Sequence, residues 1–199
     1  VAADAQLTSV ALVTHDMGDT VGGELLAREI EGTLSFTVTE RVLTNGSIYI
    51  DMAQLTSGQQ FLLAADDALL PEGWGGDGAG FRASLAAICS PDHQPSPDDL
   101  AALWQFMARG GGDRLMARTI RYIEDRRAEE ARFTGAIERH PSPLGIVWGA
   151  LDPVAVYRMT DKLLGARPDA RRITLEDVGH FPMLEDAPRT AQAIVSLLR

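Results

Sequence analysis

The 199-residue sequence has very little cysteine, and because Cys89 stands alone, no disulfide can form within the chain. This is typical of proteins from a reducing compartment, and we expect a cytoplasmic location. No run of apolar residues is long enough to cross a bilayer, and we find no signal-peptide pattern. Positive charge is also scarce, because 18 Lys and Arg stand against 28 Asp and Glu, for a formal net charge of −10. We therefore expect neither nucleic acid nor a membrane as a partner.

The remaining composition is that of an ordinary globular domain, with 45% hydrophobic and 23% charged residues. Short apolar segments that favour strands alternate with segments of helical periodicity at both ends of the chain. That alternation predicts an α/β fold, in which a mostly parallel sheet is flanked by helices. The predicted strands are 7–13, 39–45, 144–148 and 172–175, and the predicted helices around them are 21–31, 156–164 and 188–198.

The stretch from about 48 to 140 differs, because its pattern is helical but broken by glycine and proline. We predict one helix that begins at Ser96 with Pro97 in its first turn, and a long helix from Asp113 towards Ile137. A helical block between two strands indicates a cap, or lid, inserted at the edge of the sheet. The expected organisation is a first core part at 1–47, the cap at 48–141 and a second core part at 142–199.

The most informative residues are His15 and Asp16, which follow the first predicted strand and precede a helix. A strand that turns directly into a helix exposes one side chain at the tip of the turn, beside the free N–H groups of the helix. That arrangement is a nucleophile elbow, and its tip residue here is Asp16. Asp152 and His180 follow the third and fourth predicted strands. Because the carboxyl ends of parallel strands meet at one edge of a sheet, we expect these three side chains to lie close together.

Residues 15–18 (His-Asp-Met-Gly), 149–153 (Gly-Ala-Leu-Asp-Pro) and 179–182 (Gly-His-Phe-Pro) resemble three motifs of one family. They are similar to the elbow, the acid loop and the catalytic-histidine loop of α/β-hydrolases of the epoxide hydrolase and haloalkane dehalogenase group. In that group the Asp of the elbow is the nucleophile. Gly18-Asp19 is similar to the mesoderm-specific-transcript branch. The resemblance covers nearly the whole chain and implies the α/β-hydrolase fold with an inserted helical cap.

The chain is similar to only the C-terminal two-thirds of such a hydrolase. The family's sheet begins with several strands ahead of the elbow, and a His-Gly-x-Pro loop among them supplies a second oxyanion N–H. We expect preceding residues or a partner to supply these N-terminal strands, because a remnant of the sheet would expose an unpaired edge. A homodimer is left open.

The resemblance implies a catalytic triad of Asp16, Asp152 and His180. Asp16 would attack a saturated carbon and form an alkyl-enzyme ester. His180, oriented by Asp152, would activate the water that hydrolyses this ester, and the backbone N–H of Met17 would hold the oxyanion. We expect a small apolar organic substrate and no cofactor, and no set of residues has the spacing of a metal site.

The leaving group distinguishes two reactions. Epoxide opening needs an acid, which the family takes from a pair of lid tyrosines; Tyr122 is our candidate for one, while Phe61 stands near the expected place of the other. A dehalogenase usually has a Trp directly after the nucleophile, where this chain has Met17. We therefore predict epoxide hydrolysis to a diol, with dehalogenase-type hydrolysis of carbon–halogen bonds as the alternative. A non-catalytic hydrolase-like binding protein is a further alternative, favoured by Thr14 in place of the glycine usual two residues before the nucleophile.

Several residues also have structural interpretations. Asp16 could cap the helix and do nothing else, and His15 is predicted to help fix the elbow. Trp74 and Trp104 either line a pocket or pack the cap, and the glycine-rich segment 73–80 is predicted to be a flexible part of the lid. Two further histidines lie beside prolines in predicted surface loops and are given no role: His93 and His140.

Overall fold

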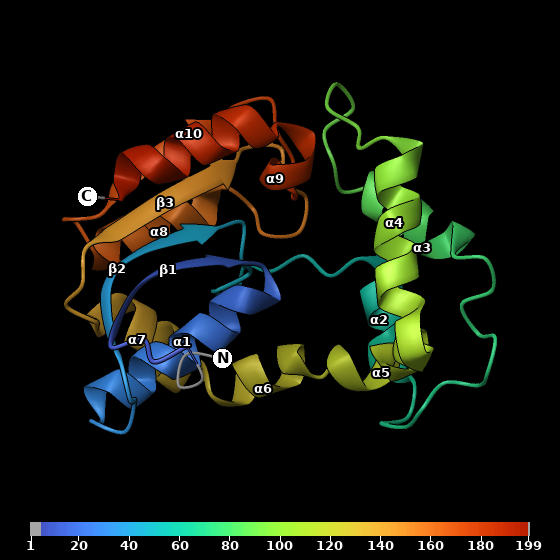
Figure 1. Cartoon of the computed structure of the whole chain (residues 1–199), viewed down its shortest axis with the longest axis horizontal. Helices are drawn as coiled ribbons and strands as arrows, with labels where there is room; N and C mark the ends of the chain where they lie inside the picture. Colours follow the sequence, from blue (N-terminus) through green and yellow to red (C-terminus); the bar gives the residue numbers. More distant parts are fainter. Residues whose placement is uncertain (1–4, 199) are drawn as a thin grey trace.

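The computed structural model describes residues 5–198. Its sheet consists of β1 (Ser9–His15), β2 (Thr37–Thr44), β3 (Leu144–Gly149) and β4 (Arg171–Leu175). Within the described residues these four strands lie in the order β1-β2-β3-β4, and all neighbouring pairs are parallel, as predicted. The strands therefore all end at the same edge, which faces a separate group of helices (Figure 1).

Helices cover both faces of the sheet, with α1 (Met17–Ile30), α7 (Glu130–Arg139) and α8 (Arg158–Ala166) on one and α10 (Ala187–Leu197), preceded by the short α9 (Pro182–Glu185), on the other. Leu43, Ile146 and Trp148 are buried on the first face. Val42 and Val147 are buried under α10. Neighbouring residues of a strand thus pack on opposite sides, as the two-residue period of a strand requires. Among residues 5–198, no helix is both long and apolar enough to cross a membrane.

The middle of the chain forms the cap, which lies beside the carboxyl ends of the strands (Figure 1). It is built from α2 (Ser57–Ala64), α3 (Ala79–Ala86), α4 (Pro97–Ala108), the 3-10 segment η1 (Arg109–Leu115), α5 (Met116–Thr119) and α6 (Tyr122–Ala128). The start of α4 is as predicted, because the Ser96 side chain accepts a hydrogen bond from the N–H of Asp99 and Pro97 stands in the first turn.

The single long helix predicted from Asp113 towards Ile137 is wrong, because the chain there forms η1, α5, α6 and α7 in succession. Glu129, with φ −114° and ψ 28°, separates α6 from α7. The break turns α7 onto α1, where a Cβ added at Gly23 would lie 2.7 Å from the carbonyl oxygen of Phe133. Helical periodicity does not reveal this break, because no proline or glycine stands at it.

The two ends of the region predicted as cap, 48–141, pack with the sheet. Ala136 and Ile137 of α7 belong to the same buried cluster as the strands, and so do Ile48 and Tyr49. Only the helices between these ends form the separate group that faces the strand edge.

The prediction of a surface loop at His140 is wrong. Its ring is buried, with Nδ1 2.9 Å from Ser142 Oγ and Nε2 3.1 Å from a carboxylate oxygen of Glu29. The carbonyl of His140 accepts hydrogen bonds from the guanidinium groups of Arg41 and Arg167. These contacts hold the loop after α7 against α1, β2 and the end of α8, and burial lowers the pKa of His140.

Candidate active site

Asp16 stands at a strained turn between β1 and α1. Its φ of 48° and ψ of −114° lie outside the regions that L-residues usually adopt. The helix begins at the next residue, yet the Asp16 side chain makes no capping hydrogen bond to it. Capping therefore does not account for this carboxylate. Strain of this kind accompanies a side chain that must be presented at the tip of a turn, as in a nucleophile elbow.

Thr14 fits this elbow because the facing helix leaves room for it. A Cβ added at Gly22 would lie 2.9 Å from Thr14 Cγ2, and one at Gly18 would lie 3.9 Å from Thr14 Cβ. The space that a glycine two residues before the nucleophile would provide comes instead from Gly22. Thr14 is thus accommodated at this turn.

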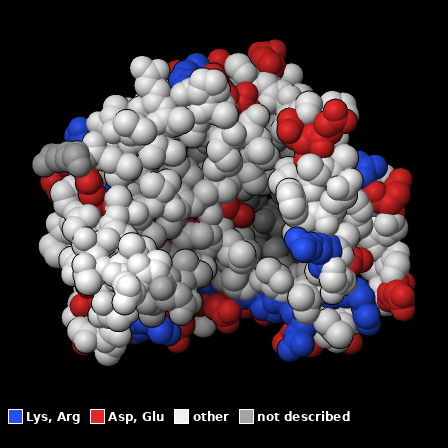
Figure 2. Space-filling model, viewed as in Figure 1, with Lys and Arg blue, Asp and Glu red and all other residues white. Residues whose placement is uncertain are grey.

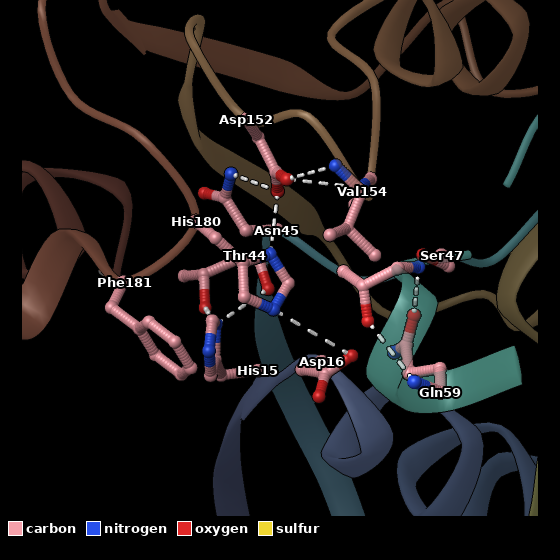
Figure 3. A network of polar contacts seen from close by, with 12 residues as sticks. His15, Asp16, Thr44, Asn45, Ser47, Gln59, Asp152, Val154, His180 and Phe181 are labelled. Carbon is pink, nitrogen blue, oxygen red and sulfur yellow. Dashed lines mark hydrogen bonds and ion pairs between the residues drawn. The ribbon is translucent and has the colours of Figure 1, made fainter. Parts of the chain in front are cut away.

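The structure brings the three predicted side chains together at the carboxyl ends of β1, β3 and β4 (Figure 3). His180 Nδ1 lies 2.8 Å from Asp152 Oδ2, and His180 Nε2 lies 3.9 Å from Asp16 Oδ1. The backbone N–H of His180 also donates to the carbonyl of Ile88 in the cap, at 3.0 Å. One carboxylate therefore fixes the orientation of the imidazole ring, while the other ring nitrogen faces the elbow.

Asp152 is buried with both carboxylate oxygens hydrogen-bonded. Oδ1 accepts from the backbone N–H groups of Val154 and Ala155, at 2.7 and 3.0 Å. Oδ2 accepts from Asn45 Nδ2 at 2.8 Å, in addition to its contact with His180. Four partners thus hold this carboxylate in one orientation, which in turn fixes the histidine.

Asn45, which is not among the site residues predicted from the sequence, joins the loops that carry the acid and the histidine. Its Nδ2 lies 3.3 Å from the carbonyl oxygens of both Gly149 and Gly179, and its Oδ1 accepts from the N–H of Gly149 at 2.9 Å. Its φ of 43° is one that Asn tolerates better than most residues. The pair Asn45-Gly46 predicts only a turn. The signal that could have revealed its role is its place at the carboxyl end of a strand next to the elbow.

The charges in the site follow from this geometry. Burial lowers the pKa of His180, but the carboxylates of Asp152 and Asp16 outweigh burial and raise that pKa to about 10. Burial raises the pKa of Asp16, but the neighbouring His180 outweighs it and holds the pKa below its usual value. At neutral pH an imidazolium thus faces a carboxylate. Burial lowers the pKa of His15 to about 4, and its Nδ1 lies 3.2 Å from the carbonyl of Thr44, which fits the structural role predicted for this neutral ring.

A cavity of about 540 Å³ lies over these residues, between the core and the cap. Trp74 and Trp104 both line it, and Phe61 stacks on Trp74 with 6.4 Å between ring centroids. The described residues that line the cavity include no lysine or arginine. Figure 2 shows the hollow, whose visible walls are mostly uncharged. The remaining apolar lining residues come mainly from the cap: Leu62, Phe81, Leu85, Ile88, Met107, Met116 and Ile120.

Tyr122 and Met17 are the other predicted site residues, and both line this cavity beside Asp16. Burial and the negative charge of Asp16 raise the pKa of the Tyr122 phenol, so that it carries its proton at neutral pH. Met17 is the first residue of α1, where backbone N–H groups have no acceptor within the helix. Among residues 5–198, no group of three His, Cys, Asp or Glu side chains is placed to hold a metal ion.

The acid and histidine loops touch through their backbones, which makes Gly149 a sensitive position. A Cβ there would lie 2.1 Å from the carbonyl oxygen of Gly179. We expect Gly149→Ala to lower the free energy of unfolding by about 1–3 kcal/mol, because the loops must move apart. Urea denaturation followed by circular dichroism measures this change. Gly165→Ala is the matched control, since no atom lies within 4 Å of its added Cβ. Equal stability of the two variants would contradict this close approach.

A sequence model of the alpha/beta hydrolase family matches residues 1–193, and the chain belongs to this family. The chain is 34% identical over 194 residues to the protein named "Putative hydrolase LipZ" from Mycobacterium tuberculosis, which covers 96% of this chain and 65% of that protein. It is 27% identical over 186 residues to the mesoderm-specific transcript homolog protein of Bos taurus, covering 91% of this chain and 55% of that protein. The chain thus spans less than two thirds of the length of these relatives.

Solved structures agree on the fold. An alpha/beta hydrolase fold protein from Burkholderia ambifaria superposes with a TM-score of 0.70 at 23% identity, over 98% of this chain and 67% of that one. The enol-lactonase from Burkholderia xenovorans LB400 superposes with a TM-score of 0.70 at 16% identity, over 99% of this chain and 68% of that one. At such identities the likeness shows the α/β-hydrolase fold, which confirms the predicted fold class.

Proposed function

We propose that this α/β-hydrolase acts through a covalent alkyl ester on Asp16, and that its reaction is the opening of an epoxide to a diol. The observation that carries this proposal is the carboxylate of Asp16, held at a strained elbow and facing His180 inside an apolar cavity. A carboxylate is a competent nucleophile towards a saturated carbon with a strained or good leaving group. The relative named as a hydrolase is consistent with this reaction class.

In the first step, a carboxylate oxygen of Asp16 forms a bond to an epoxide carbon while that carbon's bond to the ring oxygen breaks. The leaving oxygen takes a proton from the hydroxyl of Tyr122, which lines the cavity beside Asp16 and is protonated at neutral pH. The apolar walls of the cavity exclude competing water and bind the uncharged substrate.

In the second step, water attacks the carbonyl carbon of the ester and gives its proton to His180 Nε2. The proton that His180 carries at rest has by then replaced the one lost by Tyr122, so that the imidazole is free to act as a base. The backbone N–H of Met17 donates to the tetrahedral oxyanion. When the intermediate collapses, the diol oxygen takes a proton from His180 and Asp16 is left as a carboxylic acid. That acid then gives its proton to His180, which restores the resting carboxylate and imidazolium.

A carbon–halogen bond is the second candidate for the bond that breaks. Met17 stands where a dehalogenase usually has a Trp, which favours the epoxide. Trp74 and Trp104 nevertheless bring two indole groups to the cavity, and an indole N–H is a suitable donor to a leaving halide.

The test is intact mass spectrometry of the His180→Gln variant after incubation with styrene oxide, and separately with 1-bromohexane. Without its base the variant should form the ester and fail to hydrolyse it. We expect a mass gain of one whole styrene oxide, located on Asp16 by peptide mapping. A hexyl group without bromine would assign the site to dehalogenation instead. The absence of any adduct from either compound would overturn the proposal and favour a non-catalytic binding protein.

A control keeps this result specific for the elbow. The double variant Asp16→Ala/His180→Gln has the same cavity walls but lacks the carboxylate. It should gain no mass from either compound. A mass gain that persisted in this double variant would show that a carboxylate other than Asp16 reacts.

A further inference from the structure

A buried arginine of the cap reaches the backbone of the elbow. Arg126 lies on α6, and only 2% of its surface is exposed. Its Nη2 donates to the carbonyl oxygen of Asp16 at 3.3 Å, and its Nε donates to Thr20 Oγ1 at 2.7 Å. Its Nη1 donates to the carbonyl of Ser47. One guanidinium thus ties the cap to the turn before α1, to α1 itself and to the segment after β2.

The same guanidinium also lies against Tyr122. Tyr122 precedes Arg126 by four residues on α6, so both side chains project from one face of the helix. The centre of the guanidinium stands 5.2 Å from the centroid of the tyrosine ring, within the range of a cation–π contact. Arg126 therefore contacts both the backbone of the proposed nucleophile and the ring of the proposed acid.

A residue that only joined α6 to the core would not need the positive charge of Arg126. Burying a guanidinium is costly, and within the described residues no carboxylate forms an ion pair with Arg126. Its charge instead adds to that of His180 in lowering the pKa of Asp16, and partly offsets the burial that raises the pKa of Asp19. Apolar side chains could join α6 to the core without this cost. The charge is thus placed where it serves the elbow.

We propose that Arg126 is a positioning residue, which sets the distance and angle between the Tyr122 hydroxyl and the Asp16 carboxylate by holding both. This inference rests on the proposed function, because it concerns the first step of that reaction. Nucleophile and acid must reach the two ends of one carbon–oxygen bond, and a misplacement of about 1 Å can cost about 100-fold in rate.

The test measures the rate of ester formation in the His180→Gln background, in single-turnover reactions with styrene oxide. We expect Arg126→Met to slow ester formation about 100-fold at saturating epoxide. The half-saturating concentration should change less than about threefold, because the apolar residues that bind the substrate are untouched. Arg126→Lys keeps the charge but not the planar fork of donors, and its rate should fall between those of Met and Arg. The lysine variant keeps the test available if Arg126→Met does not fold.

Two comparisons separate positioning from general stability. Arg132→Met removes another arginine that joins two elements, through Glu24 and Glu31 of the α1 region, without contact to Asp16 or Tyr122. It should form the ester at the parental rate. In a Tyr122→Phe background, Arg126→Lys should slow the reaction much less than in the parent, because its effect passes through the lost hydroxyl.

The outcomes are distinguishable. If His180→Gln alone forms no ester, the proposed function fails and this inference falls with it. If the ester forms but the Arg126 variants match the parental rate, or if their effects add fully to that of Tyr122→Phe, Arg126 does not position the acid.

Discussion

Asp16→Ala is expected to abolish turnover of epoxides, with a loss of about 10⁴-fold or more in kcat/KM. The carboxylate is the atom group that bonds to substrate in the proposed reaction, and no other described carboxylate lines the cavity. A weak residual rate would come only from water held in the cavity. Steady-state hydrolysis of styrene oxide, measured by chromatography of the diol, gives the comparison with the parent chain.

Asp186→Ala is the matched control for this variant, because Asp186 also directly precedes a helix. Its side chain accepts a hydrogen bond from the N–H of Arg189 and so caps α10, which the Asp16 side chain does not do for α1. Loss of that cap should cost about 1 kcal/mol of stability. Asp16 is itself an L-residue at this positive φ, so alanine inherits the existing backbone strain, and its cost should also be about 1 kcal/mol. The two variants should therefore unfold alike while only Asp16→Ala loses turnover. Retained turnover in Asp16→Ala would assign this carboxylate to capping or strain alone.

The positions of the three residues of the proposed triad were predictable because they depend on topology. Asp16, Asp152 and His180 each follow a strand, and parallel strands bring such positions to one edge. The alternation of strands and helices fixes this topology without any knowledge of side-chain contacts. The structure adds the order of contact: Asp152 fixes His180, and His180 faces Asp16.

The supporting residues were not predictable in the same way. Asn45 has the sequence signature of a turn, and its contacts with the acid and histidine loops arise only when three strands lie side by side. Arg126 has the signature of an exposed helical residue in a charged run. It is buried because it contacts the elbow, Thr20 of α1 and the segment after β2, all far from it in the sequence. Long-range packing determines the contacts of Asn45 and the burial of Arg126, and the local periodicity of the sequence does not indicate either.

Asp19, at the elbow itself, is another residue whose environment could not be predicted from the sequence. It stands in the first turn of α1, where an acidic residue is expected to be exposed and favourable. Instead it is buried against Gly46, where an added Cβ would lie 1.8 Å from Asp19 Oδ2. Burial raises the pKa of Asp19 to about 7. Gly18-Asp19 is similar to one branch of the family, but only the fold places the Asp19 side chain in a buried environment.

The ester on Asp16 is expected to accumulate during turnover at low pH and to disappear at high pH. In the resting site two carboxylates raise the pKa of His180 to about 10. Formation of the ester removes the charge of Asp16, so that Asp152 alone supports the imidazolium and the pKa of His180 falls. Below that lowered pKa, the fraction of neutral imidazole, and with it the rate of ester hydrolysis, should fall about tenfold for each pH unit. Ester formation should stay nearly constant from pH 5 to 9, because Asp16 remains ionised throughout.

Acid quenching during steady-state turnover, followed by intact mass spectrometry, measures the esterified fraction at each pH. His15 does not confuse the result, because its pKa is lowered to about 4 and its ring stays neutral over this range. His180→Gln should remain fully esterified at every pH. Asp152→Asn should slow ester hydrolysis by about 10³–10⁴-fold, because the imidazole loses its orientation as well as its charge partner. An esterified fraction that does not vary with pH would mean that His180 is not the base. A steep decline towards high pH would show that loss of the Asp16 charge on esterification lowers the pKa of His180, so that its neutral ring can act as the base in the second step.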